Sequence, residues 1–167
     1  ESANNGVVRI DDIDVGAHLW NDYVDAAADA SFYHRIEWKE LNERTFGHQA
    51  FYLAHSDEGR INGILPLIMI RSRIFGRLLC SLPFLNYCGP SAVDAATTGL
   101  LVAEASRIAE REAANYLELR ALRVCDDALP VSTEKISLTV PLATDHETIW
   151  TGFTSKHRNN IRRSYKT

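Results

Sequence analysis

Four cations near the C-terminus are the side chains whose type and spacing most clearly suggest chemistry: Lys156, Arg158, Arg162 and Arg163. Like charges on successive turns of a helix repel each other by a few tenths of a kcal/mol per pair (about 0.2–0.5), and a phosphate-bearing ligand would relieve that repulsion. Arginine also binds phosphate through two parallel hydrogen bonds. We therefore predict that these residues bind the phosphate of an acceptor. A tRNA backbone, a nucleotide-sugar diphosphate and a lipid diphosphate all fit, and a solvated face that pairs with the acids of another domain is the alternative.

A second candidate is a pair of opposite charges, Glu118 and Arg120, on one face of an expected strand. If that face lines a cleft, Glu118 could accept a proton from an attacking amine, and Arg120 could hold a carboxylate or a phosphate. We predict that they form a catalytic pair. The alternative is a solvated or mutually paired charged face, because alternation of residue type along a strand produces one without any function.

A third candidate is the loop that contains Asn86, Tyr87 and Gly89, which follows an expected strand and precedes the longest expected helix. Backbone N–H groups at such a position can hold phosphate, so we predict that these three residues bind a phosphate-bearing ligand. The glycine-rich phosphate-binding stretch typical of acetyl-CoA-dependent enzymes is missing. A structural loop with Tyr87 packed inward is the alternative.

Other catalytic arrangements are not indicated. The sequence has no Gly-x-Ser-x-Gly motif and no cysteine with a nearby histidine, so a covalent enzyme intermediate is not expected. The six histidines are scattered and form no zinc-binding pattern, so no metal site is expected. We expect His34 and His48 to be structural or surface residues.

Composition limits the class of protein. The chain has 167 residues, of which 46% are hydrophobic and 24% charged, as in an ordinary globular domain. Its three cysteines lack Cys-x-x-Cys spacing, which argues against a disulfide framework and favours a reducing compartment; Cys80 is expected in the core. No apolar run is long enough to span a membrane and no signal peptide opens the chain. We expect a cytoplasmic protein, with a peripheral association with the inner membrane as an open possibility, from which an N-terminal piece before Glu1 has been trimmed.

Charge is distributed unevenly along the chain. Residues 155–167 hold five cations and no acid, and the other 154 residues hold 13 basic and 22 acidic side chains, a balance of −9 within the overall −4. A net acidic body argues against general coating of nucleic acid, so DNA is not an expected partner.

Periodicity predicts the elements that must position these candidates. We expect helices over 17–28, capped by Asp14, and over 36–46, ended by Gly47. A hairpin of strands 50–54 and 61–70 follows around a turn at 56–59, with Pro66 marking an edge, a bulge or a splay. The remaining expected elements are a strand at 77–82, a loop at 83–90, a helix at 96–115 and strands at 116–122 and 136–140.

The last expected element is a helix, or two in series, that opens with capping-box spacing from Thr144 to Glu147. The order predicts an α/β (α+β) protein whose mixed sheet is flanked by helices. We expect one domain over residues 1–143 and, over 144–167, a basic helix that starts a truncated second domain.

Six stretches, in this order, resemble the Fem-type (FemAB/FemX-like) aminoacyl- and acyltransferases of the GNAT superfamily, in particular the exopolysaccharide- and exosortase-associated members. They are FYH at 32–34, GILPL at 63–67, SRIFG at 72–76, SLPFLNY at 81–87, LELR at 117–120 and KHRNNIRR at 156–163. The family has a second GNAT-like domain that is absent here, and its loop often reads Asn-Tyr-Gly-Gly where this chain has a cysteine at position 88.

The resemblance implies the first of two GNAT-like domains and transfer of an aminoacyl or acyl group to an amine or sugar of a cell-envelope or exopolysaccharide precursor. The implied donor is aminoacyl-tRNA or acyl-CoA, with Asn86, Tyr87 and Gly89 as its binding residues and no tightly bound cofactor. The implied partners are the precursor, charged tRNA, the missing C-terminal domain and, transiently, the inner membrane surface. Two alternatives stay open: a non-catalytic module that binds a phosphorylated glycan or lipid carrier, and an ordinary acyl-CoA-dependent N-acyltransferase.

Overall fold

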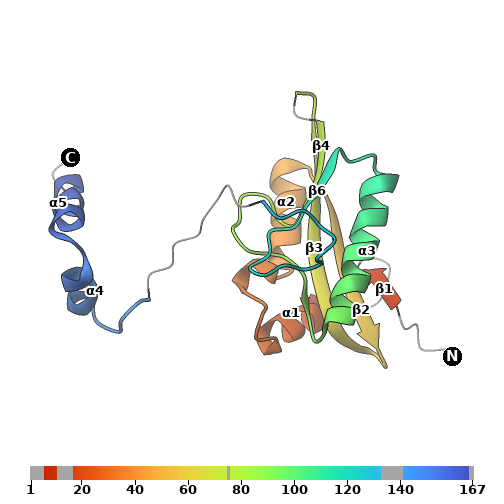
Figure 1. Ribbon diagram of the computed structural model, residues 1–167, viewed down its shortest axis with the longest axis horizontal. Helices are drawn as coiled ribbons and strands as arrows, with labels where there is room; N and C mark the ends of the chain where they lie inside the picture. The colour runs from red at the N-terminus through yellow and green to blue at the C-terminus, as the bar shows by residue number, and fades with distance from the viewer. Residues whose placement is uncertain (1–5, 11–16, 75, 133–140, 166–167) are drawn as a thin grey trace. The chain divides into compact units, whose positions relative to one another are not determined.

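The structure is a computed structural model that describes residues 6–10, 17–74, 76–132 and 141–165. The chain divides into two compact units, Glu1–Val131 and Ser132–Thr167, and each is described by itself (Figure 1). The strand expected at 136–140, the Asp14 cap and the side chain of Lys166 lie outside the described residues. The domain boundary expected after residue 143 stays a prediction.

The first unit is built on a mixed sheet whose strands lie in the order β1-β2-β3-β4-β6, with β5 pairing beside β3. The pairs are antiparallel except for β4 and β6, which run parallel. The fold class expected from the sequence, a mixed α/β sheet with flanking helices, is confirmed. The strands are β1 (Gly6–Arg9), β2 (Gln49–Asp57), β3 (Arg60–Ser72), β4 (Gly76–Cys80), β5 (Ser91–Ala92) and β6 (Tyr116–Glu118).

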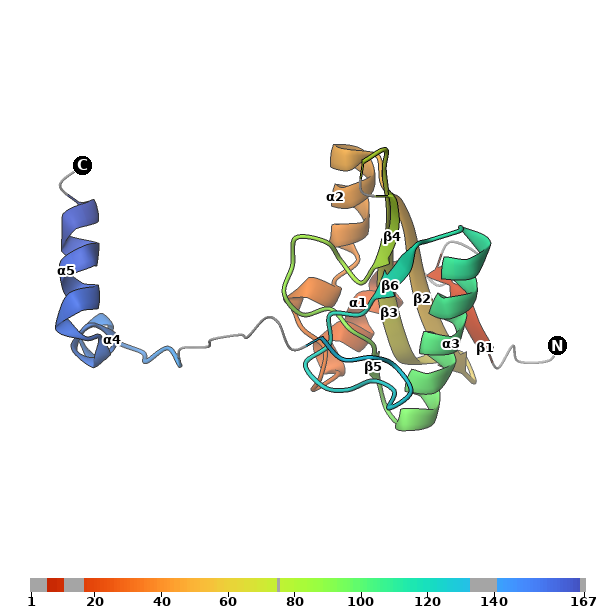
Figure 2. The same cartoon turned by 45° about the horizontal axis from the view of Figure 1, so that its top comes forward.

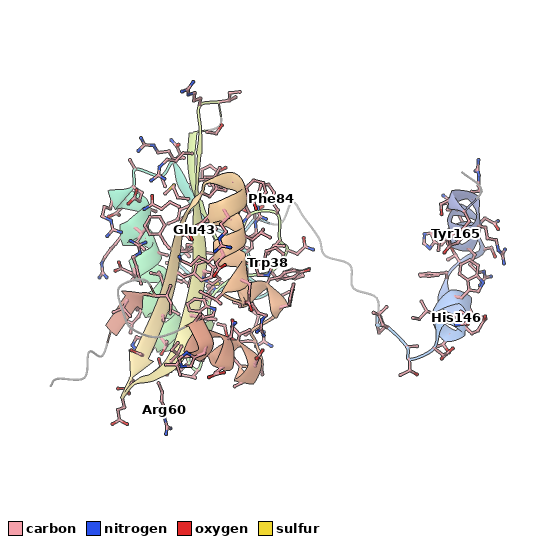
Figure 3. All side chains as sticks on the ribbon, turned by 180° about the vertical axis from the view of Figure 1, so that it is seen from behind. Trp38, Glu43, Arg60, Phe84, His146 and Tyr165 are labelled. Atoms are coloured by element: carbon pink, nitrogen blue, oxygen red, sulfur yellow. The ribbon has the colours of Figure 1, made fainter. Side chains whose placement is uncertain are left out.

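The expected hairpin is formed by β2 and β3. Asp57 pairs with Arg60, so a two-residue turn of Glu58 and Gly59 joins the strands, and Figure 3 shows Arg60 at its tip. Both turn residues have positive φ, 48° and 77°, which matches the twist of antiparallel strands and explains why glycine stands at the second position.

Strand β3 lies at the centre of the sheet. On one side β2 pairs with it along its length; on the other, β5 pairs with Gly63 and Ile64, and β4 pairs with residues 68–72. Pro66 falls between these two partners, where no described strand pairs on that side. The edge position considered for Pro66 is therefore wrong, and the residue marks the place where the neighbours of β3 part.

Helices cover both faces of this sheet (Figures 1 and 2). One face carries α1 (Ala17–Ala26), the short η2 (Phe32–His34) and α2 (Glu37–Phe46), and the other carries α3 (Ala95–Arg111). Alternation along β3 sends Ile64 and Ile68 into the cluster around Trp20 and Tyr52. On the other face, Leu65, Leu67 and Met69 pack in a second cluster with Leu101, Ala105 and Ile108 of α3. Two cores therefore share one central strand.

Two predicted elements, α3 and β6, end four residues earlier than expected. Helix α3 ends at Arg111 rather than at Asn115, because Ala113 has φ 51° and Asn115 bonds to Arg77 through both its backbone and its side chain. Strand β6 ends at Glu118 rather than at residue 122, because Arg120 turns to bond with Ser81 and Cys88 instead of continuing the ladder. Leu101, Ala105 and Ile108 of α3 are buried, and Ala109 is half-buried.

The second unit contains two helices in series, α4 (His146–Gly152) and α5 (Ser155–Ser164). Its expected cap is displaced by one residue: Asp145, not Thr144, accepts the hydrogen bond from the backbone N–H of Thr148, at 2.8 Å. Thr154 caps α5 in the same way. No described residue of either helix is buried.

None of the helices in the described part of the chain combines the length and the apolar character that crossing a membrane would require.

Candidate functional site

A cavity of about 520 Å³ opens on the first unit. Four stretches far apart in sequence contribute to its wall, so it exists only in the folded chain. Its lining residues are Ala28, Asp29, Ala30, Ser31, Tyr33 and His34 before and within η2, Tyr87, Gly89 and Pro90 in the loop, Thr98 in α3, and Ala121, Leu122, Arg123, Val124 and Cys125 after β6.

The topology explains why the cavity lies there. Strands β4 and β6 are parallel, α3 connects them, and the segments that follow their carboxyl ends form much of the wall. The N–H of Cys88 donates to the carbonyl of Arg120 at 2.9 Å, which holds the two segments side by side (Figure 2). Ligands of open α/β sheets bind outside the carboxyl ends of parallel strands, so this is the expected place for a ligand.

Gly89 is required by close packing. A Cβ at this position would lie 2.6 Å from the Cβ and 2.8 Å from the Cα of Ala121, and the second contact is with backbone that cannot swing aside. Any larger residue would push the loop away from residue 121 and change the shape of the wall.

His34 fastens the same loop to η2. Its Nδ1 accepts the backbone N–H of Ser31 at 3.1 Å, so Nε2 carries the proton and donates to the carbonyl of Gly89 at 2.9 Å. Burial lowers the pKa of this imidazole, which favours the neutral ring that both hydrogen bonds need. The structural role expected for His34 is confirmed: it positions the loop.

Asp29 brings a carboxylate to the cavity wall. Its Oδ1 accepts a 2.6 Å hydrogen bond from the buried Ser91 hydroxyl, which also lies 3.5 Å from the Tyr23 hydroxyl. Burial of the Tyr23 phenol raises its pKa, so it remains a hydrogen-bonding neutral group. This chain of bonds fixes the carboxylate between α1 and β5.

Glu118 and Arg120, the predicted catalytic pair, contact each other. Arg120 Nε donates to Glu118 Oε1 at 2.7 Å, and Arg120 Nη1 donates to the carbonyl of Leu85 at 2.8 Å. The mutually paired alternative is therefore what the structure contains. Neither side chain lines the cavity, and Arg120 holds the loop that does. Their catalytic role stays a prediction.

The cysteines are free thiols in surroundings that favour the protonated form. Burial raises the pKa of Cys80 to about 12 and that of Cys88 well above its usual value. Burial also raises the pKa of Cys125, the thiol on the cavity wall. A thiolate nucleophile is thereby disfavoured at all three positions.

Only two of the three donor-binding residues predicted from the sequence lie on the cavity wall. Tyr87 and Gly89 line the cavity, whereas Asn86 is exposed and lies off its wall. The segments 28–34 and 121–125 were missed as wall segments. The Ser-x-x-His spacing at 31–34 predicts a cap, but only the fold brings it opposite residue 89.

The basic helix forms a separate site in the second unit. A hollow of about 470 Å³ is lined by Trp150, Thr151, Ser155, Arg158, Asn159 and Arg162. The Arg162 guanidinium lies 5.3 Å from the centre of the Trp150 ring, in a cation–π contact. Arg158 Nη1 donates to the carbonyls of Trp150 and Thr151 at the end of α4, at 3.4 and 3.2 Å.

The other two predicted phosphate-binding cations, Lys156 and Arg163, are exposed and do not line this hollow. They are seven residues apart and share one side of α5, whereas Arg158 and Arg162 are four apart and share another. The structure therefore splits the four cations into two pairs. In the described segments, no three His, Cys, Asp or Glu side chains gather in a way that could hold a metal ion.

Comparisons with known proteins give a structural likeness but no sequence match. No protein-family model and no curated protein sequence matches the chain. Among solved structures it is similar to the crystal structure of FemX, with a TM-score of 0.41 and 19% identity over 61% of this chain. The match takes in 25% of the FemX chain, so this sequence corresponds to about a quarter of that protein. At this identity the likeness concerns the fold alone.

Proposed function

We propose that this chain is the donor-binding part of a Fem-like acyltransferase, which transfers an aminoacyl or acyl group to an amine or sugar of a cell-envelope or exopolysaccharide precursor. The observation that carries the proposal is the cavity of about 520 Å³ beyond the carboxyl ends of β4 and β6, beside the first turns of α3. The resemblance of six sequence stretches to that family supports it.

The cavity suits direct transfer from a bound donor. An acyl donor lying along it would pass between the loop after β4 and the segment after β6, both of which are fixed by the Cys88–Arg120 bond. Direct transfer needs a positioned ester or thioester and a nucleophilic amine, and it needs no enzyme nucleophile. The protonated state favoured for the three cysteines agrees with this route.

The start of α3 is not a free anion site. Asp94 caps it, accepting the N–H of Thr97 at 2.7 Å, so a carboxylate already occupies the positive end of the helix. A donor whose phosphates must rest there would meet this negative charge. That favours an aminoacyl ester over a CoA thioester as the donor.

One observation favours a second candidate, a non-catalytic binding module. Glu118 Oε1 is engaged by Arg120, and Arg120 in turn is engaged by the loop carbonyls, so both side chains have a structural role that needs no reaction. If that structural role is their only one, the cavity would capture a ligand without turnover.

The deciding experiment blocks the cavity. Ala28 is an exposed residue of the cavity wall, and Ala26 is an exposed residue off that wall. Ala28→Trp is expected to weaken binding of acyl-CoA or of a non-hydrolysable aminoacyl-tRNA about tenfold or more, and Ala26→Trp to leave it unchanged. Equal effects of the two variants, or no binding of either donor to the unmodified chain, would refute the proposed donor site.

Turnover by the intact protein separates the two candidates. With Glu118→Gln, an acyltransferase that uses this carboxylate as its base should lose turnover by about a hundredfold or more while donor binding persists. Donor binding without any turnover by the unmodified protein would favour the binding module. A steep fall of donor binding with salt would identify charged tRNA as the donor.

A further inference from the structure

The hollow between α4 and α5 contains an unusual concentration of phosphate-binding groups. Arg158 and Arg162 project from one side of α5, and Ser155 and Asn159 of the same helix line the hollow with them. Trp150 of α4 also lines it. None of its six lining residues is acidic.

Each guanidinium is held in place and still has donors to offer. Arg162 rests against the Trp150 ring at 5.3 Å and has no ion pair with a described residue. Arg158 uses Nη1 on the α4 carbonyls, and its Nε and Nη2 groups have no hydrogen-bond partner in the described segments. A guanidinium has five N–H groups, so both arginines retain donors for an anion. Holding them in advance lowers the entropy lost when a ligand binds.

We propose that Arg158 and Arg162, with Ser155, Asn159 and Trp150, form a binding site for a diphosphate group, and that Lys156 and Arg163 are not part of it. The proposal rests on the proposed function only for the role of the ligand, which would be the diphosphate handle of the acceptor. The site narrows the four-cation prediction made from the sequence to two cations and adds three residues that charge patterning had not marked.

The size of the hollow and the grouping of its hydrogen-bond donors favour a single diphosphate over a nucleic-acid backbone as the ligand. Two guanidiniums one helical turn apart can bind adjacent phosphates of one small molecule. A nucleic-acid strand, by contrast, needs cations spread along its path, and its affinity would then draw on Lys156 and Arg163 as well. The acidic balance of −9 over the rest of the chain also opposes a long polyanion.

The test is titration of the 167-residue chain with inorganic pyrophosphate, followed by NMR at the tryptophan indole N–H groups. The chain has three tryptophans, and Trp20 and Trp38 of the first unit serve as internal references for Trp150. We expect a saturable shift of the Trp150 signal alone. Arg162→Gln should weaken binding about tenfold, because a charge-assisted contact is lost.

Matched controls separate a built site from general attraction. The double variant K156Q/R163Q removes as much charge from α5 as R158Q/R162Q but should weaken binding by no more than about threefold through screened long-range attraction. Equal losses in the two double variants, or no saturable shift of Trp150, would overturn the proposal. Because Arg158 also bonds to the α4 carbonyls, Arg162→Gln alone, with helicity checked by circular dichroism, keeps the test decisive if the R158Q/R162Q variant unfolds.

Further arms identify the source of the diphosphate. A nucleoside diphosphate and a short-chain isoprenyl diphosphate both contain this group. The compound that binds more tightly identifies the carrier of the diphosphate, and either result supports the site. A single-stranded RNA oligomer that binds tighter than pyrophosphate and depends equally on all four cations would overturn it. Donor binding in the first unit, measured with Ala28→Trp, is independent of these results, so each proposal can fail without the other.

Discussion

Tyr52 buries a hydroxyl group that packing alone does not explain. Its ring is fully buried, 5.1 Å from the Trp20 ring, and its hydroxyl has no hydrogen-bond partner among the described residues. Burial raises its pKa well above the usual value, so the hydroxyl stays neutral. Burying an unpaired hydroxyl costs about 1–3 kcal/mol, a cost that phenylalanine would avoid at the same shape.

We therefore expect Tyr52→Phe to leave the free energy of unfolding unchanged or to raise it by about 1 kcal/mol, as measured by urea denaturation. Tyr52→Leu is the matched control. It also removes the hydroxyl but loses ring packing, and it should destabilise the chain by about 2 kcal/mol or more. A loss above about 1 kcal/mol in Tyr52→Phe would reveal a partner for the hydroxyl outside the described residues.

His34 should make stability depend on pH. Burial lowers its pKa in the folded chain, so the unfolded chain binds the proton more readily. The stabilising contribution is therefore present above the unfolded pKa of about 6.5 and is lost as the pH falls below that value toward the folded pKa. Unfolding free energies measured from pH 7.5 to 5 should fall for the native chain and fall less for His34→Gln.

Carboxyl groups do not obscure this comparison. Hydrogen bonds to backbone N–H groups lower the pKa of Glu37, Asp94 and Asp145, so their titration affects stability only near or below about pH 4.5. Identical pH profiles for the native chain and His34→Gln would show that the imidazole is not held neutral.

At the scale of elements, the loop after β4 is shaped by backbone contact, and two glycines give opposite predictions. Gly89→Ala places a Cβ against the backbone of Ala121 and should destabilise the chain by about 1–3 kcal/mol. Gly99→Ala, inside α3 with nothing within 4 Å of the new Cβ, should stabilise it by about 0.5–1 kcal/mol. Thermal unfolding of the two variants measures both. Stabilisation by Gly89→Ala would show that the loop does not pack on residue 121.

Local pattern was enough to predict most helices and the hairpin. The end of α2 at Gly47 depends on neighbours within a few residues, and it is confirmed. The ends of α3 and β6 could not be predicted, because Asn115 bonds to Arg77 and Arg120 bonds to Ser81 and Leu85, all of them distant in sequence.

The candidate site was predictable only in part for the same reason. A loop between a strand and a helix marked Tyr87 and Gly89, but the segments that face them come from elsewhere in the chain. Segment 121–125 reaches them through the parallel pairing of β4 with β6, and segment 28–34 through the hydrogen bond from His34 to Gly89. The charge run marked four cations of α5, and helix geometry then separates them into two pairs. Trp150 was missed because its contact with Arg162 spans two helices.

At the scale of the whole molecule, the burial of apolar side chains is concentrated in one unit. Both hydrophobic clusters meet on β2 and β3, whose residues 50–54 and 63–69 are buried, whereas no described residue of α4 or α5 is buried. Amides in a strand shared by two cores open only with global unfolding, and helices without buried contacts open at little cost.

Hydrogen exchange should display this contrast directly. We expect the amides of β2 and β3 to exchange slowest, at the free energy of global unfolding, and those of α5 to exchange faster, through local opening of the helix. Inorganic pyrophosphate should then slow exchange in α5 but not in β3, because a ligand stabilises the state that binds it in proportion to its occupancy. If α5 were as well protected as β3 without ligand, Ile149, Phe153 and Ile161 would have to be covered by residues outside those described, and the hollow beside Trp150 would be a packing surface.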